Sequence, residues 1–278
     1  MPPPSLPVSP AALQGLVDEI KASSRDSGVL VIAGARELVA VLRRDLVRDG
    51  VAGATREHGS LDGALAVVYV LAGEADDDDR EVLREAERRR VPVVCVVAGP
   101  GGADAPDPPY VLARNVVRVP PSSGFPLEEI AEALARSLGE RATPLAARLP
   151  VLRRAVAGEL TRRIARQNGL IASTTIVPGA DMPVLTLNQI RLVLRIADAY
   201  GFEVDRERIP EVLGVVGGGL GLRALARRSL GVVPVAGWVV KGGIAYAGTR
   251  ALGEAARRYF ERRAPVTRIA GGRLRFPR

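Results

Sequence analysis

The sequence predicts two domains of different class: an α/β domain with a doubly wound, mainly parallel sheet, followed by an all-α domain. Three observations predict this. In the first half, short apolar runs alternate with helical periodicity, which is typical of a sheet with helices on both faces. In the second half the periodicity is helical. The charge also changes sign, since residues 1–140 carry 15 Lys and Arg against 22 Asp and Glu, whereas residues 141–278 carry 24 against 9.

Four segments are expected along the 278 residues, a length that allows two domains with a core each. Residues 1–24 form a proline-rich leader and an amphipathic helix, residues 25–142 the α/β domain, residues 143–264 the helical domain, and residues 265–278 a basic tail. Strands buried on both faces are expected at four apolar runs: residues 29–33, 66–71, 92–97 and 116–119. Helices are expected at residues 11–23, 37–48, 80–90 and 126–138.

Three features of the acidic half have both a functional and a structural interpretation. The acidic run of residues 76–79 could bind a cation, but capping of the next helix explains it without one. His58, the single histidine, could be a general base or a metal ligand, yet no second ligand accompanies it, which favours a surface loop. Cys95 could be a nucleophile, but its valine neighbours favour a small buried hydrophobe. We therefore expect no metal site and no catalytic residue.

The loop after the first strand is where a nucleotide would bind in such a sheet. A P-loop has a second glycine, a lysine and a hydroxyl residue there, because these groups hold the phosphates and Mg²⁺. The first glycine is present as Gly34, but Val39, Ala40 and Val41 replace the other three. We predict that these apolar residues face the core, so that no nucleotide cofactor is held.

The order of elements over residues 27–140 nevertheless resembles small GTPase domains of the translation-factor type. Residues 66–90 are similar to the family's middle strand and the following helix, and residues 119–130 to its final strand, loop and helix. Residues 93–99 resemble the strand that ends in the guanine-reading N-K-x-D motif, which residues 98–101 replace with Ala-Gly-Pro-Gly. The resemblance implies a sheet of the P-loop NTPase or GTPase type without enzymatic activity, a pseudo-GTPase. A GTPase-like enzyme with an unorthodox nucleotide site is the alternative.

The basic half reads as a series of helices. A long helix is expected from Pro144, with an apolar stripe and many arginines on its other faces, ending at Asn168-Gly169. Thr186 and Gln189 have the spacing of a capping box, which predicts a helix that begins there and ends at Gly201.

Residues 179–260 resemble the domain-of-unknown-function family 697, the YcjF-like bacterial proteins. The matching motifs lie in the same order: Gly179-Ala180-Asp181, Thr186-x-x-Gln189, Ile196-Ala197-x-x-Tyr200-Gly201, Gly217-Gly218-Gly219-Leu220-Gly221-Leu222-Arg223, Pro234-x-x-Gly237-Trp238, Ala245-Tyr246-Ala247-Gly248-Thr249, Ala251-Leu252-Gly253 and Tyr259-Phe260. The resemblance implies a helical domain that is often fused to a GTPase-like domain and is in several members membrane-embedded. It carries no catalytic residue over to this chain.

A glycine-rich hairpin over residues 209–249 is the candidate contact with a membrane. Residues 229–249 hold one charge, Lys241, and as a helix would reach about 31 Å, roughly the thickness of a hydrocarbon core. Spacings of four between glycines permit close helix packing, at Gly214, Gly217, Gly218 and Gly221. The residues predicted to contact a membrane or a partner are Arg223, Arg227, Arg228, Trp238 and Lys241. A buried, soluble hairpin is the alternative.

Together these observations predict a non-catalytic scaffold or regulatory protein on the cytoplasmic side of the cell membrane. A protein partner or self-association is expected, because the basic half, with a net charge of +15, could dock on the acidic half, with a net charge of −7, of the same or another copy. Nucleic acid is disfavoured as a partner, since no aromatic residues are interleaved with the arginines. A single cysteine and the lack of a signal-peptide pattern at residues 1–10 agree with a cytoplasmic location. A soluble cytoplasmic interaction module is the alternative.

Overall fold

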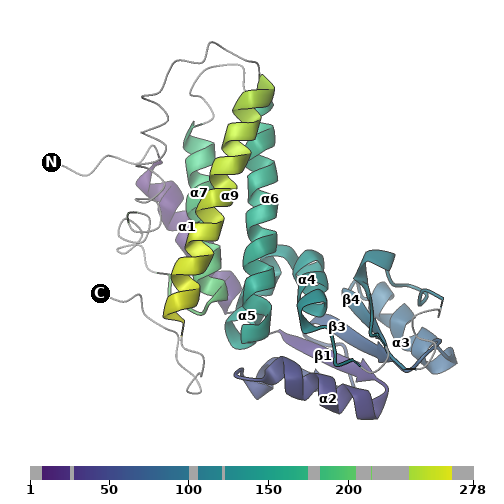
Figure 1. Ribbon diagram of the computed structural model, residues 1–278. Coiled ribbons are helices and arrows are strands. Elements are labelled where there is room, and N and C mark those ends of the chain that lie inside the picture. Colours follow the sequence, from purple (N-terminus) through teal and green to yellow (C-terminus); the bar gives the residue numbers. More distant parts are fainter. Residues whose placement is uncertain are drawn as a thin grey trace. The chain divides into compact units, whose positions relative to one another are not determined.

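The computed structural model describes residues 8–25, 28–99, 106–120, 123–174, 182–204, 214 and 238–264 (Figure 1). The chain divides into an α/β unit, within residues 26–156, and a helical unit, within residues 1–25 and 157–264. The predicted order of an α/β fold followed by helices is therefore confirmed. The division falls after Val156, whereas the sequence predicted it after residue 142.

The α/β unit contains a five-stranded sheet in which every pair of neighbouring strands is parallel. Its strands are β1 (Val29–Gly34), β2 (Thr55–Glu57), β3 (Ala64–Leu71), β4 (Val93–Val97) and β5 (Val116–Arg118). The strand order is β2-β1-β3-β4-β5, which is the flavodoxin-like order of doubly wound sheets. In this order the chain changes direction between β1 and β3, and the crevice there is where ligands bind in such folds.

Three helices of this unit follow the predicted positions within a few residues: α2 (Arg36–Val47), α3 (Asp77–Arg88) and α4 (Leu127–Leu138). The single long helix predicted from Pro144 is wrong, because α5 (Thr143–Arg148) ends before a 3₁₀ turn at Pro150–Leu152 and a new helix begins at Arg153. Further 3₁₀ turns lie at Ala52–Ala54, Ala113–Asn115 and Gly139–Ala142. Right-handed crossovers in opposite directions place α2 and α3 on opposite faces of the sheet. The connection from β2 to β3, residues 58–63, contains no helix.

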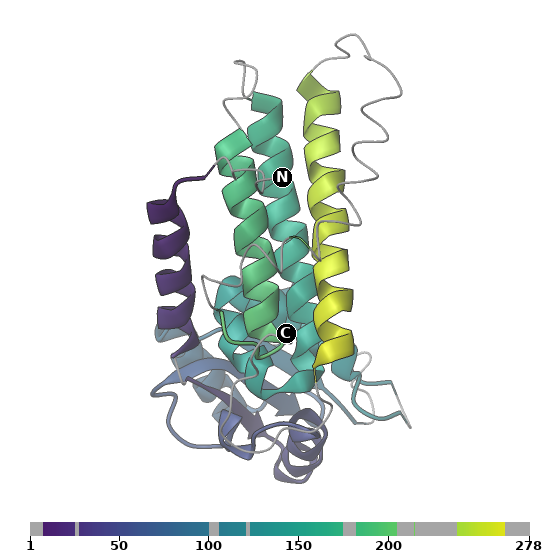
Figure 2. The same cartoon turned by 90° about the vertical axis from the view of Figure 1, so that its left-hand side faces the viewer.

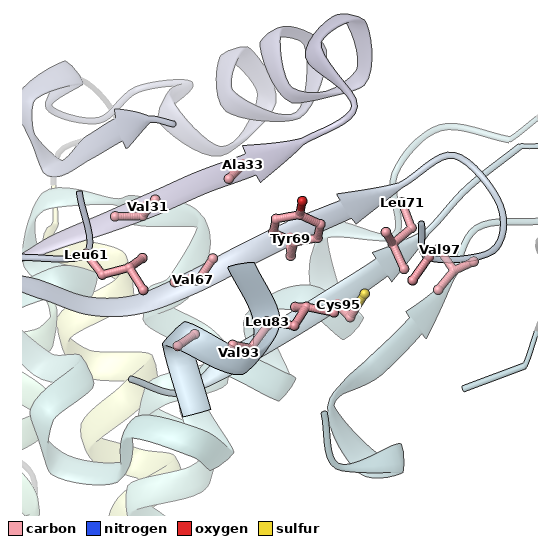
Figure 3. Close-up of a cluster of buried hydrophobic side chains, with 12 residues drawn as sticks. Val31, Ala33, Leu61, Val67, Tyr69, Leu71, Leu83, Val93, Cys95 and Val97 are labelled. Carbon is pink, nitrogen blue, oxygen red and sulfur yellow. The ribbon is translucent and has the colours of Figure 1, made fainter. Parts of the chain in front are cut away.

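Alternate residues of the central strands form one buried face under α3 (Figure 3). Val67 and Tyr69 of β3 lie beside Cys95 of β4, and Leu83 of α3 covers them. Leu61, from the connection between β2 and β3, covers the part of this face over β1. The strands are thus buried on both faces, as the valine-rich runs predicted.

The helical unit consists of α1 (Pro10–Ser24), α7 (Met182–Ala199), α9 (Trp238–Arg263) and most of α6 (Arg153–Thr174). Helices α6, α7 and α9 lie side by side along their lengths (Figures 1 and 2). Helix α1 packs on α7, with Leu16, Val17 and Ile20 against Ile190 and Leu194. The amphipathic helix expected at residues 11–23 is therefore confirmed, and it belongs to the core of the helical unit.

Two predicted helix ends are wrong. Helix α6 continues through Asn168-Gly169 to Thr174, because tertiary contacts override the local stop signal. The Asn168 amide donates to Thr249 Oγ1 at 3.0 Å and accepts from Asn188 Nδ2 at 2.8 Å. Helix α7 begins at Met182, so Thr186 and Gln189 lie inside it and do not form its N-terminal capping box.

Glycines bring α6 and α9 into close contact. A Cβ on Gly242 would lie 2.8 Å from the carbonyl oxygen of Gly169, and one on Gly253 would lie 2.3 Å from Thr161 Oγ1. Such distances leave no room for a side chain: at Gly242 the two helix backbones meet directly, and at Gly253 the Thr161 side chain packs on the α9 backbone. These glycines pack closely as small residues do, but they are not the ones named from the sequence, whose packing stays a prediction.

Candidate functional site

The turn after β1 was the position expected to hold phosphate in a GTPase. Gly34 has φ +107°, and a Cβ there would lie 2.0 Å from the carbonyl oxygen of Val70. The next amide, of Ala35, donates to that same oxygen at 2.9 Å. The glycine therefore serves close packing of β1 on β3, and the first amide of the turn is already satisfied within the sheet.

The first turn of α2 follows this position. Val39 is completely buried, as predicted, but Ala40 is exposed and Val41 is 39% exposed. The expectation that all three face the core is therefore wrong for two of them, because α2 contacts the sheet through one narrow stripe. Glu37 occupies the first turn, where its carboxylate complements the positive end of the helix dipole.

The acidic run before α3 forms a capping box, which confirms the structural interpretation. Asp76 accepts from the amide of Asp79 at 2.8 Å, and Asp79 accepts from the amide of Asp76 at 3.1 Å. Asp79 also accepts from the hydroxyl of Tyr69 at 2.7 Å. Burial and this carboxylate raise the pKa of Tyr69. Across the described residues, no group of three or more His, Cys, Asp or Glu side chains is placed to hold a metal ion.

A cavity of about 430 Å³ lies beside α3 at the crevice between β1 and β3. Its floor is apolar and is formed by Val31, Ala33, Val67 and Tyr69. Residues 58–61 and α3 form its rim. His58, with φ 50°, donates its amide to Ile32 and lines this rim, so it is a loop residue on a cavity.

Three charged residues on the rim of this cavity, Glu85, Arg88 and Arg89, form ion pairs, and Glu81 adds a carboxylate. Arg89 forms ion pairs with Glu85 at 2.5 Å and with Asp62 at 2.6 Å, and Arg88 pairs with Glu85 at 3.3 Å.

Cys95 belongs to the buried cluster under α3, and burial raises its pKa to about 12. The thiol is therefore protonated at neutral pH, which confirms Cys95 as a small buried hydrophobe. An apolar ligand group is what this cavity suits.

At one end of the helical unit, the described helix segments carry a single charged residue, Lys241 in the first turn of α9. We call the rest of this end the uncharged end: residues 167–174 of α6, 182–190 of α7 and 242–249 of α9, none of which is Asp, Glu, Lys or Arg. These helix ends lie together in Figures 1 and 2. Four large apolar side chains are exposed there, with Leu170 66% and Ile244 69% accessible: Leu170, Met182, Val184 and Ile244.

Next to the uncharged end lies a set of basic residues that we call the arginine cluster: Arg162 and Arg166 of α6 with Arg250 of α9. Arg250 Nη1 donates to Tyr246 Oη at 3.4 Å. This hydrogen bond, with the charges of Arg250, Arg166 and Arg162, lowers the pKa of Tyr246. These residues were not selected from the sequence. The spacing of four residues between Arg162 and Arg166, and between Tyr246 and Arg250, was nevertheless a signal that each pair shares one helix face.

The residues predicted to contact a membrane or partner are only partly described. Arg223, Arg227, Arg228, Gly217, Gly218 and Gly221 lie outside the described residues. Lys241 is half-buried on α9, Trp238 begins that helix, and a Cβ on Gly214 would meet no described atom within 4 Å. Residues 238–249 belong to α9, which continues to Arg263. Within the described ranges, no helix is both long and apolar enough to cross a membrane.

Comparison of the chain with protein-family models, with curated proteins and with solved structures gave no match. The resemblances to small GTPases and to family 697 therefore stay predictions from the sequence.

Proposed function

We propose that the protein is a non-enzymatic scaffold or regulator that binds a membrane surface through the uncharged end of its helical unit. The observation that carries this proposal is the exposure of Leu170, Met182, Val184 and Ile244 on helix ends whose described residues hold no charge apart from Lys241. Transfer of a Leu or Ile side chain from water to an apolar environment contributes about 1.5–3 kcal/mol. Four such side chains at one end supply a driving force that an ordinary charged surface lacks.

The charge next to this end supports a membrane surface as the partner. Arg166 and Arg250 are exposed and lie within two residues of the uncharged end on α6 and α9. Basic residues near an anionic leaflet contribute about 1 kcal/mol each. Apolar side chains at the tip with arginines behind them match the layering of an acyl boundary and its head groups.

The absence of enzymatic activity is supported by the turn after β1. The amide of Ala35 is used by the sheet, and Glu37 places a negative charge in the first turn of α2. A phosphate would be repelled by Glu37, and Ala40 stands at the position where a P-loop has its lysine. The proposed relation to GTPases is weaker, because the strand order β2-β1-β3-β4-β5 agrees with a flavodoxin-like sheet. In this proposal the α/β unit is an interaction domain.

Sedimentation with lipid vesicles tests the membrane proposal. The variant Leu170→Gln/Ile244→Gln should bind at least fivefold more weakly than the wild type, because two of its apolar contacts become polar. The matched control is Val41→Gln/Leu112→Gln, which alters two exposed apolar residues of the α/β unit and should bind like the wild type. Wild-type protein that stays in the supernatant, or equal binding by both variants, would overturn the proposal.

Calorimetric titration with GTP and with ATP tests the non-enzymatic part of the proposal. We expect no heat of binding at millimolar nucleotide. Micromolar binding of either nucleotide would contradict it and would support the alternative of an unorthodox nucleotide site.

A second candidate function rests on the cavity beside α3. Its apolar floor, the ion pairs on its rim and the exposed Val82 suit an apolar side chain of a protein partner. Val82→Glu would place a charge at the mouth of the cavity. A partner recovered with the wild type and lost with this variant, while vesicle binding is unchanged, would assign partner binding to the α/β unit.

A further inference from the structure

The arginine cluster lies between two close contacts of α6 and α9. On one side Gly169 meets Gly242 and the Cβ of Tyr246, and on the other Thr161 meets Gly253. The two helices are antiparallel by this register, so Arg166 lies level with Tyr246 and Arg250 level with Arg162, about one helical turn apart along the pair. Arg162 and Arg166 share one face of α6, and Tyr246 and Arg250 share one face of α9.

The charges of this cluster are not balanced by nearby carboxylates. Arg162 pairs with Glu159 at 2.7 Å. Glu254, the acidic residue of α9 one turn from Arg250, pairs with Arg257 and Arg258. Arg166 and Arg250 have no carboxylate within ion-pair distance in the part of the chain that the structure describes. Two guanidinium groups and a phenol therefore converge on one flank of the helix pair without an anion.

Other arginines of the helical unit have their positive charge balanced by carboxylates of the same chain. Arg191 and Arg195 both pair with Glu19 of α1, and Arg257 pairs with Glu254 and Glu261. In these places the chain supplies its own anion across helices or along one helix. Near Arg166 and Arg250 the described part of the chain places no such carboxylate, so an external anion could pair with them. The lowered pKa of Tyr246 reports the same excess of positive charge at its hydroxyl.

The guanidinium and phenol groups at this site are suited to bind an anion with several oxygen atoms. Guanidinium groups bind phosphate oxygens in a bidentate manner, and a tyrosine hydroxyl adds one more donor. Along α9, Arg250 lies eight residues from Gly242, which is about 12 Å. Interfacial segments bury their apolar parts about 5–10 Å into the head-group boundary. A protein seated on its uncharged end would thus bring these guanidinium groups to the level of lipid phosphates.

We propose that Arg166, Arg250 and Tyr246 form an oxyanion site for the phosphate of an anionic phospholipid head group. This inference rests on the proposed membrane binding by the uncharged end, and it adds a residue-specific preference for anionic lipid. Apolar contact at Leu170 and Ile244 gives binding to any bilayer, whereas this site gives the selectivity.

The test compares vesicles of phosphatidylcholine with vesicles that also contain phosphatidic acid. The wild type should bind the anionic vesicles roughly tenfold to thirtyfold more tightly, from about 1 kcal/mol for each arginine. Arg166→Gln/Arg250→Gln should lose this preference and keep its binding to neutral vesicles. The control Arg36→Gln/Arg114→Gln removes two exposed arginines of the α/β unit and should keep the preference. Tyr246→Phe should lower it about threefold, since one hydrogen bond contributes roughly 1 kcal/mol or less at an exposed site.

The outcomes separate this inference from the proposed function. Equal preference for anionic vesicles in the cluster variant and in the control would overturn the inference. Equal binding of the wild type to neutral and anionic vesicles would also overturn it. The proposed membrane binding would stand in both cases. No binding to any vesicle would overturn the proposed function. Titration with inorganic phosphate is the last measurement. If the wild type binds phosphate saturably, the cluster variant does not, and neither prefers anionic vesicles, the ligand of the site is free phosphate and not a lipid. Unchanged helical circular dichroism would show that the variants fold.

Discussion

The two units of this chain place polar and apolar groups in opposite ways. In the α/β unit, the buried cluster under α3 is aliphatic apart from Tyr69 and Cys95, and exposed charges such as Arg89 are paired. In the helical unit, Asn168, Thr249 and Asp198 are fully buried, while large aliphatic side chains are exposed at one end. The α/β unit also exposes large apolar side chains, but on separate elements: Val41 on α2, Val82 on α3, and Tyr110 and Leu112 before β5. In the helical unit the exposed apolar side chains gather at one end, which suits that surface to contact with a partner.

Buried polar groups in the helical unit also fix the register in which its helices pack. Asp198 accepts from Ser24 at 2.6 Å and Arg195 donates to Glu19 at 2.9 Å, so that α1 and α7 can pair in one register. Asn168 links α6, α7 and α9 in the same way. Aliphatic faces alone would allow sliding by a turn, whereas an unmatched buried polar group costs free energy.

The largest expected effect comes from filling a glycine contact. Gly34→Ala places a methyl group against Val70 and keeps an unfavourable positive φ, which should lower the free energy of unfolding of the α/β unit by about 4 kcal/mol. Gly63→Ala is the control, because φ is also positive there but the space is open; it should cost about 1 kcal/mol. Urea unfolding measures both. Equal losses would show that the contact with Val70 contributes nothing.

The next effect contrasts an apolar core with a polar one. Leu83→Ala in α3 should cost about 3 kcal/mol through the cavity it leaves. Asn168→Ala should cost about 2 kcal/mol, because Asn188 and Thr249 both lose a partner. Asn168→Leu, which fills the volume but offers no hydrogen bond, should not restore stability. If it does, the polar network is dispensable, and the contrast between the units fails.

A smaller effect is expected from Cys95 as the pH rises. Because burial raises its folded-state pKa to about 12, only the unfolded chain can form the thiolate between its ordinary pKa and that value. The contribution to stability is thus complete below the ordinary thiol pKa of 9.0 and falls at higher pH, by about 1.4 kcal/mol at pH 10. Comparison with Cys95→Ala over pH 8–10 isolates this term. In the folded wild type the thiol should also react slowly with a disulfide reagent at pH 8.

The smallest effect is expected at Glu254 as the pH falls. The hydrogen bond from Arg257, followed by that from Arg258, lowers its pKa to about 2. Stability from this group is complete above its ordinary pKa near 4.5 and is lost as the pH falls through the folded value. The carboxylate is largely exposed, so solvent screens the gain. Thermal unfolding of Glu254→Gln against wild type should differ at pH 7 and converge near pH 2.

The strands could be predicted because burial on both faces leaves a direct mark, a run of valines. Strand β2 could not, since Thr55–Glu57 is three residues long and all three are polar. The continuation of α6 beyond Asn168 was hidden because the partners of that amide lie on α7 and α9, far along the chain. The arginine cluster was missed for the same reason. Its members are ordinary surface arginines until the glycine contacts bring α6 and α9 together.

The meeting of Gly169 and Gly242 has a mechanical consequence. Ordinary helix interfaces adapt by small rotations of side chains, and such adjustments let a joint yield gradually under load. Here the main chains touch with no side chain between them, so rotamer changes cannot absorb a shift of α6 against α9 at this point.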